Sequence, residues 1–173
     1  MLFDNQQIET GELPRVEDIE YLPLLINYKY LLIISWTLFL IVPAGGFSLL
    51  NYLPEDEQFS LAASLGIYGG ILLLYFFRLI IIIKGFPLKG YALRKHDIIF
   101  RSGLLTRKIT AIPYNRIQHS EVRQSFLARL LKITKLKIYT AGGSASDLSI
   151  HGLSGDEAAR IKDFLSKTIC SYE

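Results

Sequence analysis

The stretch LAASLGIYGGILLLYFFRLIIII, residues 61–83, determines the fold class of this chain. It contains only one charged side chain, Arg78, near its C-terminal end. At about 1.5 Å of rise per residue, a helix of this length crosses a hydrocarbon core of about 30 Å with some tilt. A helix in the core of a soluble protein is shorter and keeps a polar face toward water. The stretch therefore predicts a transmembrane span.

A second apolar stretch, residues 31–50, lies before the first and has no charged residue. Residues 51–60 connect the two and contain three acidic residues and no basic one. Residues 30–83 are therefore expected to form a transmembrane hairpin with an acidic outer turn. Lys29 precedes this hairpin and Lys84 follows it. Because basic residues stay on the cytoplasmic side of a membrane, both chain termini are expected to be cytoplasmic.

Two kinds of side chain near the spans are candidates for contacts in the membrane. Aromatic and cationic residues at the span ends are expected to anchor the interface: Tyr28, Lys29, Tyr30, Arg78 and Lys84. Pairs of glycines allow close approach of another helix, although glycine is also simply tolerated in lipid: Gly45, Gly46, Gly69 and Gly70. Neither span contains an acidic residue or a histidine, which argues against a proton-coupled transporter.

The N-terminal segment, residues 1–29, carries six Asp or Glu against two Lys or Arg. Within residues 14–22, Val16, Ile19 and Leu22 recur at three-residue spacing with acidic residues between them. This pattern predicts a short amphipathic helix on the membrane surface, and a polar tail is the alternative.

The pattern changes to that of a sheet after a Gly/Pro-containing linker, KGFPLKG, at residues 84–90. Apolar and polar residues then alternate in about six short strands, which indicates a sheet with one buried face. Residues 125–132 predict a brief helix, and residues 155–169 a C-terminal helix that begins with a capping box of Ser154 and Glu157. Residues 91–173 therefore predict an α+β domain, an antiparallel sheet capped by a C-terminal helix.

Several short motifs in this domain occur in a distinctive order: RSGL at 101–104, IP at 112–113, RIQ at 116–118, Arg129, LKIYTAGG at 136–143, IHGL at 150–153 and AARI at 158–161. In this order and spacing the region resembles the bacterial pleckstrin-homology (PH) domain of small two-span membrane proteins of the YdbS type. Lys132 departs from the family pattern, which often has glycine in this turn.

The resemblance implies a PH-like barrel or split sheet closed by the C-terminal helix, in a bacterial cytoplasmic (inner) membrane. It further implies a non-catalytic scaffold or interaction module, with a role in envelope stress or antimicrobial resistance. The implied partner is a larger sibling with more spans and repeated PH domains, or a second copy of the chain.

Positive charge is concentrated between residues 89 and 137, with twelve Lys or Arg against two Asp or Glu. The cytoplasmic leaflet is negatively charged, so this region is a candidate for binding anionic phospholipid headgroups. The best candidates lie in the first turn and at the start of the third strand: Arg94, Lys95, Arg107 and Lys108. The alternative is a solvated sheet face that merely follows the positive-inside rule.

The sequence offers little support for catalysis. The three histidines lack the spacing of a metal site, and the loop at residues 142–144 lacks the ending of a phosphate-binding loop. The chain has one cysteine, and no pair of carboxylates stands out. We therefore expect no catalytic residue, no metal and no cofactor. A domain held at a membrane would reach nucleic acid poorly, so nucleic acid is not an expected partner either.

Overall fold

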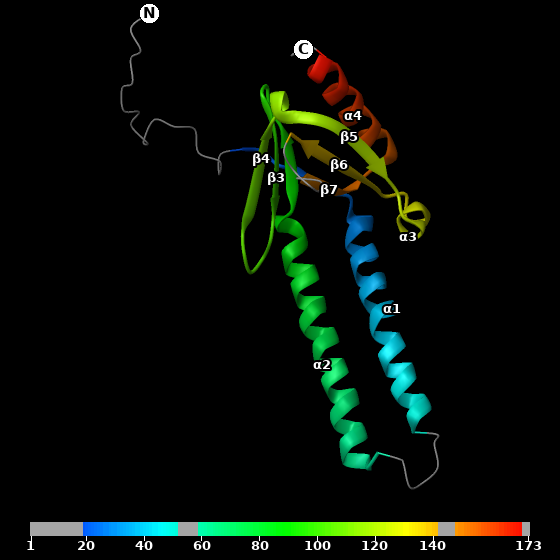
Figure 1. Cartoon of the computed structure of the whole chain (residues 1–173). Coiled ribbons are helices and arrows are strands. Elements are labelled where there is room, and N and C mark those ends of the chain that lie inside the picture. Colours follow the sequence, from blue (N-terminus) through cyan, green and yellow to red (C-terminus); the bar gives the residue numbers. More distant parts are fainter. Residues whose placement is uncertain (1–18, 52–58, 142–147, 171–173) are drawn as a thin grey trace, which may run out of the picture.

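The computed structural model describes residues 19–51, 59–141 and 148–170. Two long helices, α1 (Ile26–Leu50) and α2 (Leu61–Gly85), lie side by side beneath a domain of strands and shorter helices (Figure 1). Each helix is long and apolar enough to cross a membrane by length and composition, and its apolar part is almost entirely exposed. The two predicted apolar helices are thus confirmed as helices, although α1 begins five residues before residue 31.

The strands form two antiparallel sheets. The first sheet has the order β1 (Leu22–Pro23), β2 (Gly90–Leu93), β3 (Asp97–Ser102) and β4 (Lys108–Pro113). A short turn of 3₁₀ helix, η5 (Tyr114–Arg116), leads to the second sheet, with the order β5 (Ile117–Arg123), β6 (Thr134–Thr140) and β7 (Leu148–Leu153). The brief helix predicted after β5 is α3 (Phe126–Leu130), and the predicted C-terminal helix is α4 (Gly155–Cys170).

The hydrophobic core lies between the sheets and α4. Side chains alternate along a strand, so Leu136 and Ile138 of β6 point into this core and are fully buried. The predicted capping box at the start of α4 is confirmed, because the Glu157 N–H donates to Ser154 Oγ at 3.1 Å and the Ser154 N–H donates to Glu157 Oε2 at 3.4 Å. Lys132, after α3, has a φ of 55°. This left-handed conformation favours glycine, which explains the family pattern at this turn.

The helical hairpin of α1 and α2 is inserted within the sheet domain, between β1 and β2. Leu22 pairs with Tyr91, and Pro23 with Gly90. The prediction of an amphipathic helix over residues 14–22 is therefore wrong at its C-terminal end, where the chain forms a strand. Residues 14–18 lie outside the described residues. The sheet domain is also larger than residues 91–173, because Leu24 belongs to its buried core.

The connection predicted as a linker at residues 84–90 is instead a continuous structured turn. α2 runs to Gly85, the 3₁₀ helix η4 (Phe86–Leu88) follows, and β2 begins at Gly90. A Cβ atom at Gly90 would lie 2.9 Å from the Cβ of Tyr21, so glycine permits the close approach of β1. This connection fixes the direction in which the sheet domain leaves α2.

The helices of the hairpin contact each other through polar and aromatic side chains. Ser48 Oγ and the Tyr68 hydroxyl are 2.7 Å apart, and the Arg78 guanidinium lies 5.7 Å from the centre of the Trp36 ring. The four glycines proposed for helix packing make no such contact, because a Cβ at any of them would meet nothing within 4 Å: Gly45, Gly46, Gly69 and Gly70. Packing at these glycines remains a prediction for a helix outside this chain.

Candidate functional site

The outer face of the second sheet is polar and basic. Because side chains alternate along β6, Lys135 and Lys137 project on the side opposite the buried Leu136 and Ile138. Their cross-strand neighbours continue this face on the other two strands: Glu121 and Arg123 of β5, and Ser149 and His151 of β7. We call this surface the basic face.

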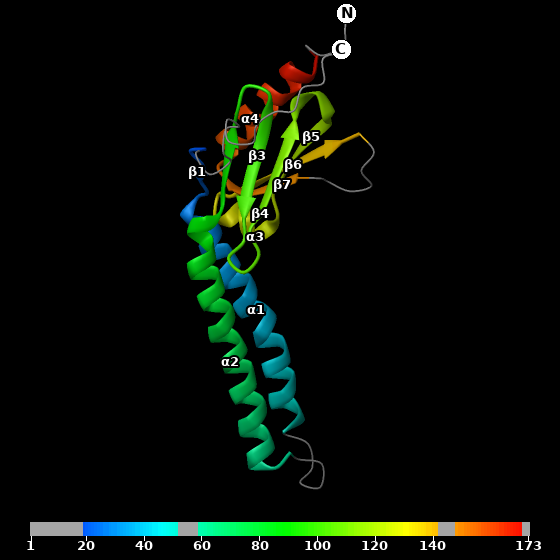
Figure 2. The ribbon, with the colours of Figure 1, turned by 90° about the vertical axis from the view of Figure 1, so that its left-hand side faces the viewer.

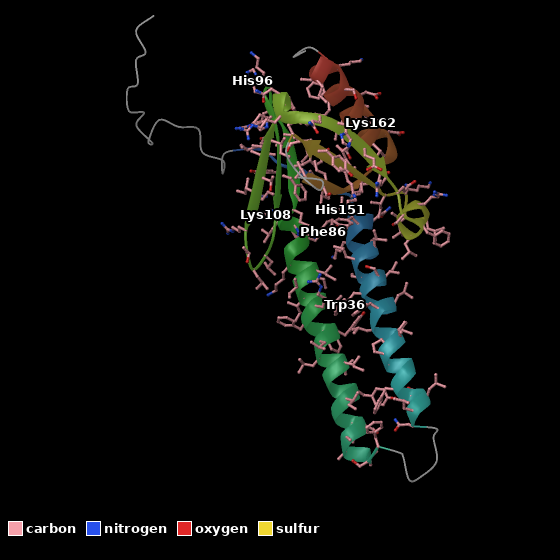
Figure 3. All side chains as sticks on the ribbon, viewed as in Figure 1. Trp36, Phe86, His96, Lys108, His151 and Lys162 are labelled. Carbon is pink, nitrogen blue, oxygen red and sulfur yellow. The ribbon has the colours of Figure 1, made fainter. Side chains whose placement is uncertain are left out.

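The N-terminal turn of α1 lies against this face. The Leu25 N–H donates to the Gly152 carbonyl of β7 at 2.8 Å. The Tyr28 ring stacks on the His151 ring with centroids 5.6 Å apart. Figure 3 shows His151 and Phe86 at the upper end of the helical hairpin, whereas His96 and Lys162 lie at the other side of the sheet domain. The basic face is therefore turned toward the hairpin, and α4 covers the opposite face (Figure 1).

A cavity of about 650 Å³ opens between α1, α3 and the basic face. We call it the hairpin-facing cavity. Three cationic side chains line it, Arg123, Lys135 and Lys137. Its apolar wall comes from both the hairpin and the sheet domain: Tyr28, Leu31, Val122, Ala128 and Ile133. The cavity therefore places cations beside an apolar surface that continues onto α1.

Positive charge in the cavity is only partly balanced. Arg123 forms an ion pair with Glu121, and the Tyr139 hydroxyl donates to the same carboxylate at 3.0 Å. In the described part of the chain, no ion pair involves Lys135 or Lys137. Burial lowers the pKa of Lys135, and the charges of Lys137 and Arg123 lower it further. Lys135 and Lys137 lie two residues apart on one face of β6, so their ammonium groups repel each other. A bound anion would therefore stabilise both.

One comparison with known proteins identifies the family. The family model described as the bacterial PH domain matches residues 31–169, which include α2, both sheets from β2 onward and most of α1 and α4. The chain belongs to the bacterial PH domain family. No curated protein and no solved structure matches the chain significantly. A bacterial PH domain suggests an interaction or lipid-binding module. The match extends over both apolar helices, so the hairpin falls within the family's region of the chain.

His151 adds a titratable group to the PH domain beside the cavity. The pKa of His151 is lowered to about 4, mainly by burial and also by the nearby positive charges of Lys135, Lys89 and Lys137, while a backbone hydrogen bond at Ser149 partly opposes the shift. The imidazole stacked on Tyr28 is thus neutral at pH 7.

We expect the PH domain to lose stability as the pH falls from about 6.5 to about 4. In this window the unfolded His151 binds a proton and the folded one does not, so protonation favours unfolding. The loss attributable to His151 should be on the order of 1 kcal/mol, since the ring is partly exposed. Thermal unfolding followed across this pH range should show a weaker dependence in His151→Gln. The exposed His96→Gln variant should keep the wild-type slope, and an unchanged slope in His151→Gln would contradict the assignment.

The four cations proposed from the sequence do not form one site. Arg94 and Lys95 lie in the turn before β3, and Arg107 and Lys108 lie at its other end. A six-residue strand spans about 20 Å, too far for one headgroup. Figure 3 labels Lys108 on the hairpin side of the domain and His96, next to Lys95, at the far end. The candidate cations therefore lie in two separate pairs, and headgroup binding by either pair stays a prediction.

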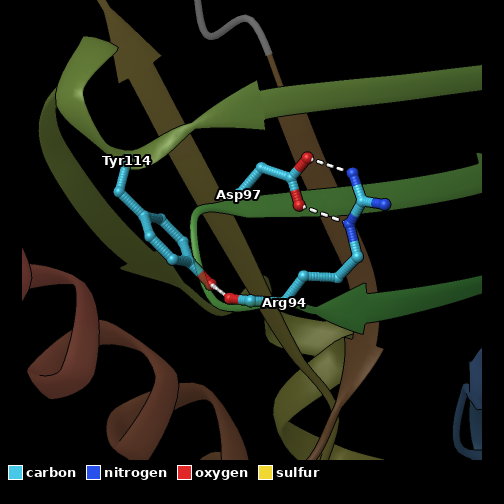
Figure 4. A network of polar contacts seen from close by, with 3 residues as sticks. All are labelled: Arg94, Asp97 and Tyr114. Carbon is cyan, nitrogen blue, oxygen red and sulfur yellow. Dashed lines mark hydrogen bonds and ion pairs between the residues drawn. The ribbon is translucent and has the colours of Figure 1, made fainter. Parts of the chain in front are cut away.

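At the far end, Arg94 is also paired within its own turn. Arg94 Nε donates to Asp97 Oδ1 at 2.7 Å, and its second nitrogen pairs with Asp97 Oδ2 (Figure 4). The Tyr114 hydroxyl donates to the Arg94 carbonyl at 2.7 Å. The guanidinium therefore closes the turn.

The proposed interface anchors divide into two groups. Tyr28 is only 8% exposed, because α1 begins at Ile26 and places this side chain against β7. It is a core residue of the PH domain, which corrects its assignment as an anchor. Tyr30 and Lys84 are exposed, Lys29 is half-buried, and Arg78 packs over Trp36.

The sequence patterns did not single out the three cations of the cavity. Lys135 and Lys137 lie two residues apart in a strand pattern, a signal that they share one face. Only the tertiary structure shows that this face meets α1 and that Arg123 joins it. Within the described residues, no group of three or more His, Cys, Asp or Glu could hold a metal ion.

Proposed function

We propose that this chain is a two-span protein of the bacterial cytoplasmic membrane whose PH domain binds the headgroup of an anionic phospholipid in the hairpin-facing cavity. One observation carries the proposal. Lys135 and Lys137 line a cavity on the side of the domain turned toward the hairpin, and neither forms an ion pair within the described residues.

The size and lining of the cavity suit such a ligand. Its volume of about 650 Å³ falls in the range of small-molecule sites. A phosphate would lie between Lys135 and Lys137, while the adjoining acyl carbons would contact Leu31 of α1. Each lysine near an anionic surface contributes about 1 kcal/mol. Because the spans already hold the chain in the membrane, this energy would select the lipid rather than recruit the protein.

The test measures which lipids the full-length chain retains. The protein is reconstituted with equal amounts of phosphatidylglycerol and phosphatidylcholine, purified in mild detergent, and its bound lipids are quantified by mass spectrometry. Wild-type protein should be enriched in phosphatidylglycerol. The variant Lys135→Gln/Lys137→Gln removes about 2 kcal/mol of attraction, so the enrichment should fall about 30-fold.

A matched control removes the same charge elsewhere. Lys95→Gln/Lys162→Gln changes two lysines on the far side of the PH domain and should keep the wild-type enrichment within about twofold, a difference of only about 0.4 kcal/mol. Equal losses in both double variants would show that overall charge, rather than the cavity, determines lipid retention. Full enrichment in Lys135→Gln/Lys137→Gln would overturn the proposal.

The second candidate function is assembly with a membrane partner, either a larger multi-span PH-domain protein or a second copy. The observation that favours it is the outer edge of β4, which has no neighbouring strand in the described sheets. Ile109 on this strand is exposed, and free strand edges accept a further strand. Pull-down of the tagged chain should then recover a stoichiometric partner, and Ile109→Pro should abolish its recovery without changing lipid enrichment.

The finer assignments are part of the same proposal. Membership of the YdbS type rests on the motifs from RSGL at 101–104 to AARI at 158–161. A role in envelope stress or antimicrobial resistance rests on that resemblance. Cytoplasmic termini rest on Lys29 and Lys84 at the span ends. We also propose that the chain is not an enzyme.

A further inference from the structure

Three large apolar side chains of the PH domain are unusually exposed. Leu105 is 81% exposed, Phe126 75% and Leu130 67%. Among the described residues outside α1 and α2, no other large hydrophobic side chain is more than 50% exposed. Exposed apolar groups of this size mark interaction surfaces when they are grouped.

Leu105 lies in the turn between β3 and β4, which extends beside the upper end of α2 (Figures 1 and 2). A Cβ atom at Gly85 would lie 3.3 Å from the Cβ of Leu104, so this turn contacts the last turn of α2. Gly103 has a φ of +102°, and a Cβ there would lie 1.8 Å from the Thr106 carbonyl oxygen. The turn therefore has a defined shape that presents Leu105 outward.

Phe126 and Leu130 lie four residues apart on α3 and share its outer side. The opposite side of α3 is held in the domain by the buried Ala128. The Asn27 side-chain amide donates to the Leu131 carbonyl at 3.0 Å, which joins the end of α3 to the first turn of α1. The exposed side of α3 is therefore fixed beside the upper end of α1.

Both surfaces lie at the level expected for a membrane boundary. The helices α1 and α2 have 25 residues each, or about 37 Å at 1.5 Å per residue. A hydrocarbon core of about 30 Å leaves about one turn at the boundary. Asn27 and Gly85, which these two surfaces contact, occupy those end turns.

The charge around the three side chains also matches an anionic surface. Residues 103–108 contain Arg107 and Lys108, and residues 126–132 contain Arg129 and Lys132. Neither segment contains an acidic residue. Apolar side chains flanked only by cations are typical of segments that enter the boundary of an anionic bilayer.

We propose that the β3–β4 turn and α3 insert Leu105, Phe126 and Leu130 into the boundary of the bilayer that holds the helical hairpin. The PH domain is thereby docked on the membrane on both sides of the hairpin, with the hairpin-facing cavity held against the lipid surface. This inference rests on the proposed membrane anchoring of α1 and α2. It does not depend on headgroup binding by Lys135 and Lys137.

The experiment uses tryptophan fluorescence in vesicles of phosphatidylglycerol and phosphatidylcholine with brominated acyl chains, which quench tryptophan on contact. The chain has a single tryptophan, Trp36, within α1. Quenching of Trp36 in the wild-type protein therefore reports whether the hairpin is in the bilayer. Tryptophan is then placed at one test position at a time in a Trp36→Phe background, after circular dichroism has shown that this background is folded.

We expect Leu105→Trp and Phe126→Trp to be quenched at least twofold by lipids brominated near the headgroup end of the chains. The matched control is Phe164→Trp on α4, which lies on the far side of the PH domain (Figure 1) and should show no quenching. If Trp36 is quenched but the tryptophans at the test positions are quenched no more than the one in Phe164→Trp, the docking is overturned and the anchoring stands. Unquenched Trp36 would instead overturn the anchoring. Test positions with blue-shifted but unquenched emission would show that protein covers this surface, which also overturns the docking.

Discussion

Replacing Tyr28 with alanine is expected to destabilise the PH domain by about 3–5 kcal/mol, the range for removing a buried aromatic side chain. Tyr28 stacks on His151, lies 6.4 Å from the Phe86 ring, and receives the Lys89 ammonium 5.2 Å from its ring centre. These contacts join α1 to β7 and to the η4 segment that follows α2. The midpoint of thermal unfolding in detergent should therefore fall by about 10 °C or more, as measured by the circular dichroism of the sheets.

Tyr30 is the matched control on the same helix. It is 52% exposed and lies outside the core of the PH domain, so Tyr30→Ala should change the stability by less than about 1 kcal/mol. If both tyrosines were membrane anchors, as their sequence context predicts, their replacement by alanine would destabilise the protein by similar amounts. Equal effects of the two variants would thus contradict the burial of Tyr28.

Gly152→Ala should cause the second large loss of stability, at the same contact between α1 and β7. Gly152 has a φ of +81°, and a Cβ there would lie 2.9 Å from the Cβ of Tyr28 and 3.0 Å from two of its ring carbons. The left-handed conformation alone costs an alanine about 1–2 kcal/mol. The contact cannot relax easily, because the Leu25 N–H to Gly152 carbonyl hydrogen bond holds the two segments together. We expect a total loss of about 3 kcal/mol, measured by the same unfolding experiment.

Two comparisons make this second prediction specific. Gly69→Ala introduces the same methyl group into open space on α2 and should be neutral or stabilising by up to about 1 kcal/mol. The double variant Tyr28→Ala/Gly152→Ala should lose less than the sum of the single losses, since the ring contacts are removed only once. Additive losses would mean that Gly152 and Tyr28 do not act through their contact.

Local patterns in the sequence were sufficient for the elements themselves. The apolar stretches at residues 31–50 and 61–83, in which Arg78 is the one charged residue, predicted most of α1 and of α2, because length and hydropathy are properties of a single segment. The alternation of Leu136 and Ile138 with lysines predicted β6, and the pairing of Ser154 with Glu157 predicted the start of α4. The series of motifs indicated a bacterial PH domain, which the match over residues 31–169 confirmed.

The candidate site was only partly predictable. The sequence placed the relevant charge between residues 89 and 137, and Lys135 and Lys137 on one strand face. It also suggested Arg94 as a ligand, whereas the folded chain pairs Arg94 with Asp97 at the far end of the domain. Charge composition carries no information about which end of a strand meets another element, so the cavity could not be located from it.

The tertiary structure decided how the hairpin joins the PH domain. Leu22 pairs with Tyr91 across 69 positions of the chain, and Tyr28 packs on Gly152 and His151 from the other end of the chain. Residues 61–83, by their length and high hydropathy, determined that the chain has an apolar helix long enough for a membrane. They contain no signal for these distant contacts, because periodicity reports the environment of one segment, whereas a contact between segments depends on the shape and packing of both. Packing alone therefore turned the basic face toward the hairpin and made Tyr28 a core residue.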